Sequence, residues 1–194
     1  MLGLKLPTDP RWVNLAEKSM EEVLNDHAFC EQKAASTCIS LIQTFPDREE
    51  LVEELSPIVT EEWGHFRLVM QELKRRNLKL GKQRKDEYVN QLLGFRKQGG
   101  TSRDEVLLDQ LLMAALIEAR SCERFRLLSE GLEEERMRNF YREFMISEAG
   151  HYRLFLDLAI TYCGKERVKE RWQQWLDFEA GVMRELEITG NRIH

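Results

Sequence analysis

A seven-residue stretch that occurs twice constrains the fold of this 194-residue chain more than any other feature. Residues 62–68 read EWGHFRL and residues 148–154 read EAGHYRL, so Glu, Gly, His, Arg and Leu recur in register. Residues three apart on an α-helix share a face, so each Glu-x-x-His turns a carboxylate and an imidazole the same way. Oxygen and nitrogen donors of this kind suit iron or manganese within a helical bundle.

The first copy follows an apolar stripe that contains one glutamate. Apolar residues keep a period near 3.6 from 28 to 45, and Glu31 interrupts them. A turn is predicted at Pro46-Asp47, then a helix over 47–76 that Pro57 kinks or divides. Glu31 lies 14 residues before Phe45 and Glu62 lies 16 after Pro46. An antiparallel hairpin would place both carboxylates about 20 Å from the turn, at one level.

The chain before this hairpin is predicted to enter a helix from an extended lead. Asp9 is positioned to cap that helix, with Pro10 in its first turn. Asn25-Asp26 marks a kink or a second cap within the apolar pattern.

The second copy has the same surroundings. A helix is predicted from Thr101 or Ser102, where Glu105 completes a capping box, to a C-terminal cap at Gly131. Its apolar stripe again contains one glutamate, Glu118, and a helix over 133–162 follows with the second Glu-x-x-His. The lone glutamates are 87 residues apart, and the Glu-x-x-His pairs are 86 apart. The two hairpins therefore repeat one another.

The repeat predicts a buried site for two metal ions. Its six candidate ligands are Glu31, Glu62, His65, Glu118, Glu148 and His151. Two divalent ions balance four carboxylates, which makes a buried cluster tolerable. A mid-helix Gly costs roughly 1 kcal/mol relative to Ala, so Gly64 and Gly150 predict close packing beside the ligands.

The predicted fold is all-α and a single domain over residues 1–194. It is a ferritin-like four-helix bundle of two antiparallel hairpins joined by a long crossover, with an added helix over 165–188. The added helix either packs on the bundle or forms an oligomer contact.

The crossover, residues 74–103, carries a basic cluster. Seven cations without an anion fall in twelve residues: Lys74, Arg75, Arg76, Lys79, Lys82, Arg84 and Lys85. They are either a solvated helix end or a phosphate-binding surface. The net charge of −5 argues against wholesale coating of nucleic acid.

Composition excludes several classes of protein. The four cysteines form no Cys-x-x-Cys pair, which excludes a rubredoxin-type site, a structural zinc clip and a thioredoxin motif. No signal peptide and no apolar run long enough for a membrane span are found, so we expect a cytoplasmic protein without membrane contact.

Beyond the ligand pattern, the segments 27–35, 60–66 and 147–152 resemble the bacterial tRNA 2-methylthio-isopentenyladenosine hydroxylases (MiaE). The resemblance implies a non-haem di-iron monooxygenase that uses O2 to hydroxylate a prenylated adenosine beside the tRNA anticodon. Its two irons would be held by the six candidate ligands. The chain has no flavin or iron–sulfur motif, so we expect an external reductase or ferredoxin. Phosphates of the tRNA would contact the basic cluster, with Arg96, Lys97 and Arg103.

Five apolar residues could form a pocket for the prenyl chain, although helical spacing also suits a core: Phe29, Trp63, Phe66, Leu112 and Phe125. Two other functions stay open. One is an oxidase, peroxidase or iron store of the ferritin or rubrerythrin kind. The other is a non-enzymatic helical module in which the six residues form a buried polar network.

Overall fold

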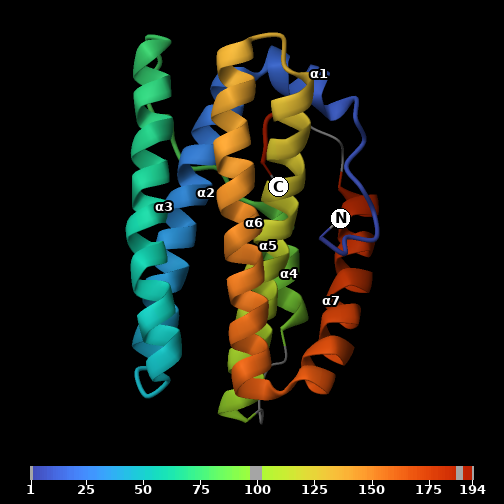
Figure 1. Cartoon of the computed structure of the whole chain (residues 1–194). Coiled ribbons are helices and arrows are strands. Elements are labelled where there is room, and N and C mark those ends of the chain that lie inside the picture. The colour runs from blue at the N-terminus through green and yellow to red at the C-terminus, as the bar shows by residue number, and fades with distance from the viewer. Residues whose placement is uncertain (1, 97–101, 187–189, 194) are drawn as a thin grey trace. The chain divides into compact units, whose positions relative to one another are not determined.

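The computed structural model describes residues 2–96, 102–186 and 190–193, and in these residues it contains seven α-helices and no strand (Figure 1). They fall into two compact units. Unit 1 holds the described residues of 1–10 and 86–188, and unit 2 those of 11–85 and 189–193. The all-α, ferritin-like class predicted from the sequence is confirmed, while a single domain over 1–194 stays a prediction.

Unit 2 is built on an antiparallel hairpin. It comprises α1 (Trp12–Lys18), α2 (Met20–Thr44) and α3 (Glu49–Arg75). α2 and α3 run side by side and are joined at residues 45–48, which confirms the predicted turn (Figure 1). Pro57 lies inside α3 and does not divide it. The hairpin buries the apolar stripes of both helices, including Leu41 and Leu55.

The start of unit 2 differs from the prediction. Arg11, not Asp9, occupies the N-cap position of α1, and no side chain caps this helix. The break comes at Ser19, and α2 continues through Asn25 and Asp26. These two side chains make tertiary contacts instead: Asn25 accepts from the backbone N–H of Gly81 at 2.5 Å, and Asp26 accepts from that of Ile193 at 2.7 Å.

Unit 1 contains the second hairpin and two further helices. Its elements are α4 (Glu87–Phe95), α5 (Arg103–Gly131), α6 (Glu135–Cys163) and α7 (Lys165–Glu185). The predicted capping box is confirmed: the backbone N–H of Glu105 donates to Ser102 Oγ at 3.3 Å, and that of Ser102 donates to Glu105 Oε2 at 3.2 Å. Gly131 is the last residue of α5 rather than its cap, because Leu132 follows in the C-cap position.

α4 was not predicted and lies within the crossover. Asp86 caps it by accepting from the backbone N–H of Val89 at 3.1 Å. Its C-terminal Phe95 stacks on Phe178 of α7, with 4.2 Å between ring centroids. α7 packs against α4, α5 and α6, so the expected packing of a fifth helix on the bundle hairpin is confirmed within unit 1. Residues 187–188 of the predicted helix lie outside the described residues.

A buried arginine ties the elements of unit 1 together. Arg120 of α5 is fully buried and donates to Glu179 of α7 and to the backbone carbonyl of Leu6 at 2.9 Å. Tyr88 of α4 contacts the same glutamate at 3.4 Å, and its burial, together with the charge of Glu179, raises the pKa of its hydroxyl well above the usual value. Desolvation raises the pKa of the Glu179 carboxyl, and the guanidinium of Arg120 opposes this shift.

In the described part of the chain, no helix combines the length and apolar character that crossing a membrane requires. All four cysteines are free thiols.

Candidate metal centre

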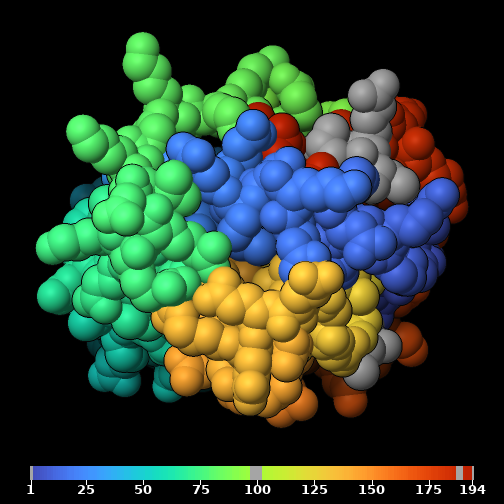
Figure 2. All heavy atoms as spheres, turned by 90° about the horizontal axis from the view of Figure 1, so that it is seen from above, coloured from blue at the N-terminus to red at the C-terminus, as the bar shows by residue number. Residues whose placement is uncertain are grey.

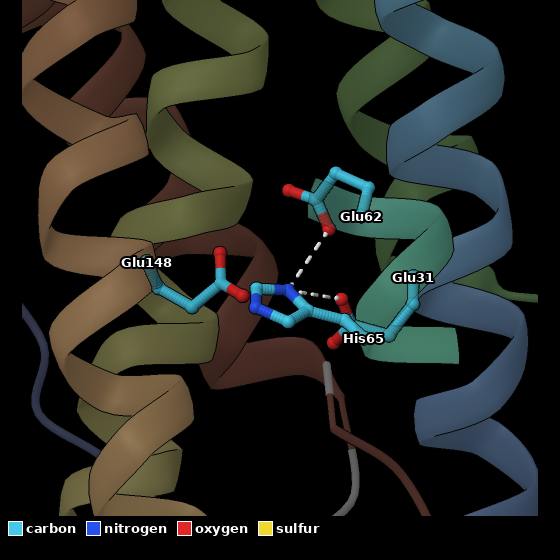
Figure 3. Close-up of side chains that lie close together, drawn as sticks. All are labelled: Glu31, Glu62, His65 and Glu148. Carbon is cyan, nitrogen blue, oxygen red and sulfur yellow. Dashed lines mark ion pairs between the residues drawn. The ribbon is translucent and has the colours of Figure 1, made fainter. Parts of the chain in front are cut away.

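Unit 2 brings three of the predicted ligands together. Glu31 comes from α2, and Glu62 and His65 come from α3 (Figure 3). His65 Nδ1 lies 3.3 Å from Glu31 Oε2 and 3.5 Å from Glu62 Oε2. One ligand atom from each residue falls within 4.8 Å of the others. The two carboxylates are buried, whereas His65 keeps a small exposed fraction.

Unit 1 brings the other three together. Glu118 comes from α5, and Glu148 and His151 come from α6. His151 Nδ1 lies 3.5 Å from Glu148 Oε2, and again one ligand atom from each residue falls within 4.8 Å of the others. All three residues are buried. Each half of the sequence repeat thus forms a triad of two carboxylates and one imidazole.

The rings of both histidines have the same orientation. Each turns Nδ1 toward the carboxylates and Nε2 toward the residue four positions earlier on its helix. His65 Nε2 lies 3.8 Å from Glu61 Oε1, and His151 Nε2 lies 3.5 Å from Ser147 Oγ. A partner on the outer nitrogen orients an imidazole and leaves the other nitrogen to face a metal.

Sequence reasoning missed His27. This side chain is fully buried in α2, and its Nε2 lies 2.7 Å from Glu31 Oε1. The signal was present, because His27 stands four residues before Glu31 and shares its helical face. His27 contacts Oε1 of Glu31, whereas His65 contacts Oε2 of the same carboxylate.

The donor set fits a divalent cation. Elsewhere in the described chain, buried carboxylates bind arginine: Asp109 receives Arg171 at 2.6 Å and Glu72 receives Arg76 at 2.6 Å. Glu31, Glu62 and Glu148 instead face histidine, a residue that serves both as a hydrogen-bond donor and as a metal ligand. Two carboxylates and one imidazole per triad match one divalent ion in charge and in donor type.

Cys122 of α5 is buried close in sequence to Glu118. Desolvation and the charges of Glu148 and Glu118 raise the pKa of its thiol to about 12. Its Sγ donates to the backbone carbonyl of Met145 at 3.2 Å. At neutral pH the thiol of Cys122 is therefore protonated.

The predicted close packing at the two glycines is wrong. A Cβ added to Gly64 or Gly150 would meet no described atom within 4 Å outside its own local helix backbone. The ligands therefore do not explain why both positions hold glycine, and we have no physical account of it.

The basic cluster divides into engaged and exposed cations. Arg75 and Arg76 donate to the buried Glu72 at 2.8 and 2.6 Å, and Arg84 donates to Glu22 at 3.0 Å. By contrast, Lys79 and Lys82 are exposed and form no ion pair among the described residues. Lys85 is also exposed. Seen from above, the green residues after α3 lie at the surface beside the blue start of α2 (Figure 2).

Further candidate residues take different places. Arg96 lies directly after α4 and Arg103 is the first residue of α5, both in unit 1. Lys97 lies outside the described residues. Among the pocket candidates, Phe125 is core, packed on Tyr141 at 5.5 Å between ring centroids, and Leu112 is buried. The remaining three belong to unit 2: Phe29 and Phe66 are half-buried, and Trp63 is exposed.

Comparison with known proteins identifies relatives along the whole chain. The family model described as tRNA-(MS[2]IO[6]A)-hydroxylase (MiaE) matches residues 2–194. A tRNA 2-(methylsulfanyl)-N(6)-isopentenyladenosine(37) hydroxylase of Pseudomonas putida is 38% identical over 82% of this chain and 76% of its own. The hydroxylase of the same name from Salmonella typhimurium is 27% identical over 93% of this chain and 83% of its own.

A solved structure is similar over nearly the same length. It is described as protein 43 with aldehyde deformylating oxygenase activity from Synechococcus. Its TM-score is 0.91 at 32% sequence identity, and the match covers 98% of this chain and 94% of that one.

Proposed function

We propose, from the premise that this chain belongs to the MiaE family of tRNA hydroxylases, that it hydroxylates the isopentenyl group of 2-methylthio-isopentenyladenosine in tRNA. The observation that carries the proposal is the pair of Glu-x-x-His triads, each with two carboxylates and one imidazole as close-set donors. Such donors on helices are those of di-iron carboxylate proteins. A tRNA substrate also implies a cytoplasmic enzyme.

The proposal requires the two triads to hold two iron ions. Their ligands would be Glu31, Glu62, His65, Glu118, Glu148 and His151. When iron and O2 are bound, such a centre supplies an oxidant able to attack an unactivated C–H bond. The reaction balances as one oxygen atom inserted into the C–H bond and the other released as water, with two electrons and two protons consumed.

The chain's own residues hold the donors in position. His27 Nε2, 2.7 Å from Glu31 Oε1, fixes one oxygen of that carboxylate and leaves the other toward His65. Glu61 and Ser147 lie near the outer nitrogens of the two histidines, at 3.8 and 3.5 Å, while Nδ1 of each faces the carboxylates. Contacts of this kind set ring orientation and ligand basicity.

The two electrons must come from outside the chain. Its sequence has no flavin-binding motif and no cysteine pattern for an iron–sulfur cluster. A separate reductase or ferredoxin is therefore part of the proposed system, and a chemical reductant would replace it in a first assay.

The direct test supplies iron-loaded protein with reductant, O2 and tRNA that carries the prenylated adenosine, followed by nucleoside analysis. Hydroxylated nucleoside is expected with the complete mixture and not without O2. A nucleoside profile unchanged by protein that holds about two irons would end the proposal. Rapid ferrous oxidation or peroxide turnover without tRNA would favour the ferritin or rubrerythrin alternative instead.

Phosphate contacts are proposed for six cations of the basic cluster: Arg75, Arg76, Lys79, Lys82, Arg84 and Lys85. Lys79 and Lys82 are its strongest candidates because they are exposed and have no ion pair among the described residues.

Replacing both lysines with Gln should weaken tRNA binding and lower the slope of log affinity against log salt by about one for each lysine. Arg75→Gln is a comparison within the cluster: Arg75 already donates to Glu72, so this variant should lower the slope by less than one. Unchanged affinity in the lysine variant would remove this cluster from the RNA surface.

An aldehyde is the second candidate substrate. The aldehyde deformylating oxygenase activity of the Synechococcus protein, which has a TM-score of 0.91 and 32% identity to this chain, supports it. The same assay with a long-chain aldehyde in place of tRNA distinguishes the two: loss of the aldehyde with release of a hydrocarbon would favour this candidate.

A further inference from the structure

A partly exposed aromatic pair on α3 is adjacent in sequence to the candidate ligands. Trp63 follows Glu62, and Phe66 follows His65. The two rings stack, with 4.8 Å between centroids and 27° between planes. Trp63 nevertheless stays 48% exposed, so Phe66 supports the indole while much of it remains open to water. An isolated exposed apolar side chain is ordinary, but a supported aromatic platform is a binding feature of proteins that hold unpaired bases.

Cations extend this platform along the same side of the helix. Arg67 and Lys74 lie four and eleven residues after Trp63, which returns them to its face at 3.6 residues per turn. Both are exposed. α3 then ends at Arg75, and the exposed Lys79 and Lys82 follow. The surface therefore presents an aromatic platform followed by positive charge, the combination that binds single-stranded nucleic acid by stacking and phosphate contact.

We propose that the Trp63–Phe66 pair stacks an unpaired base of the tRNA loop that carries the target adenosine, while Arg67 and Lys74 contact phosphates of that loop. This inference rests on the proposed function and adds the residues that would hold the substrate. Protein recognition of RNA sequence is directed mostly at loops, whose bases can stack on aromatic side chains. The positive charges of Arg67 and Lys74 complement the negative charge of the phosphates in such a loop.

The stacked base is another base of the loop rather than the target itself. At about 100° per residue, Trp63 and His65 lie roughly 160° apart around α3, on nearly opposite sides. A helix with its side chains is about 10 Å across, so a base stacked on Trp63 would stand one helix away from the ligand face. The platform thus orients the loop, and the modified nucleotide elsewhere in the loop is left to enter the site. Trp63 is in this sense a positioning residue.

Intrinsic fluorescence can test the contact. Trp12, Trp172 and Trp175 are buried, so Trp63 is the exposed indole among the four tryptophans. Titrating the full-length protein with prenylated tRNA, or with an anticodon stem-loop RNA, should quench Trp63 emission as a base stacks on it. Trp63→Phe should lose that quenching signal but keep most of the affinity, measured by filter binding, because the ring is retained.

Trp63→Ala should raise the dissociation constant for the stem-loop about tenfold, in the range of one stacked base. Leu68→Ala is the matched control, because Leu68 is also exposed on α3 but lies on another face. It should change the affinity less than twofold. Iron content and melting temperature should stay at wild-type values in all three variants, which separates the RNA contact from folding and metal binding.

The outcomes separate this inference from the proposed function. If the wild-type protein hydroxylates prenylated tRNA but Trp63→Ala binds the stem-loop with wild-type affinity, the platform is refuted and the proposed function stands. If the RNA quenches Trp63 but no nucleoside is hydroxylated, the function fails and the RNA surface stands. A Trp63→Ala defect confined to reduction by a protein electron donor would assign the platform to that donor and overturn the inference.

Discussion

The two triads carry the same donors but are supported differently. In unit 2, buried His27 lies 2.7 Å from Glu31, and the carboxylate of Glu61 lies beside His65. In unit 1, the residue four before Glu118 is Ala114, and the neutral Ser147 lies beside His151. The repeat therefore specifies the donors and not the groups that hold them. Two metal ions bound to these triads would be chemically inequivalent.

Removing one carboxylate from either triad should have the largest effect. Glu31→Ala or Glu118→Ala deletes a ligand and should lower bound iron from about two per chain to one or fewer, with hydroxylation reduced at least about 100-fold. Metal analysis on freshly loaded protein measures the first quantity, and nucleoside analysis the second. The surface variant Glu54→Ala should retain both. Two irons in Glu118→Ala would exclude this residue as a ligand.

Substituting His27 should have the next largest effect, and that effect should fall on metal binding by the triad of unit 2. His27→Ala removes the buried partner of Glu31, so we expect metal affinity to fall about 10- to 100-fold. His27→Gln supplies an N–H donor in the same place and should recover part of the loss. Competition with a chelator, read together with the melting temperature, measures both. Equal affinities in wild type, His27→Ala and His27→Gln would show that the support of Glu31 has no influence.

Substituting Cys122 should have the smallest effect. The equivalent position in unit 2 is Ala35, so this position carries a thiol in only one of the two repeats. The pKa of about 12 keeps the Cys122 thiol protonated at neutral pH. Cys122→Ala should therefore keep about two irons and hydroxylate tRNA within about twofold of wild type. Alkylation of the wild-type thiol should also be slow at pH 8, because the thiolate fraction is small. Loss of one iron in Cys122→Ala would make the thiol a ligand.

Local rules were enough to predict the triads. The i, i+3 spacing of each Glu-x-x-His, and the equal distance of Glu31 and Glu62 from one turn, depend only on helical rise and period. The capping box at Ser102 and the turn at Pro46 are local in the same sense. Prediction failed where a side chain had a distant partner. Asn25 and Asp26 predict a kink or a second cap, but their side chains accept hydrogen bonds from the backbone N–H groups of Gly81 and Ile193.

The basic cluster shows the same division. Its seven cations are visible in the sequence, but their availability depends on contacts that the sequence does not specify. Arg84 donates a hydrogen bond to Glu22, which lies 62 residues earlier in the chain, whereas the neighbouring Lys82 is exposed. α4 was missed for the related reason that its helix is stabilised by packing on α7. A nine-residue segment has little helical stability alone.

By itself, the sequence determined which residues share a helical face, and with them the two triads and the hairpins that carry them. Helical period and rise are properties of the local backbone, so they can be counted along the chain. The tertiary structure decided that His27 supports Glu31, that α4 forms, and that Trp63 stays exposed while Arg75, Arg76 and Arg84 are engaged. Burial and pairing depend on what packs against each side chain, and that partner is often far away in the chain.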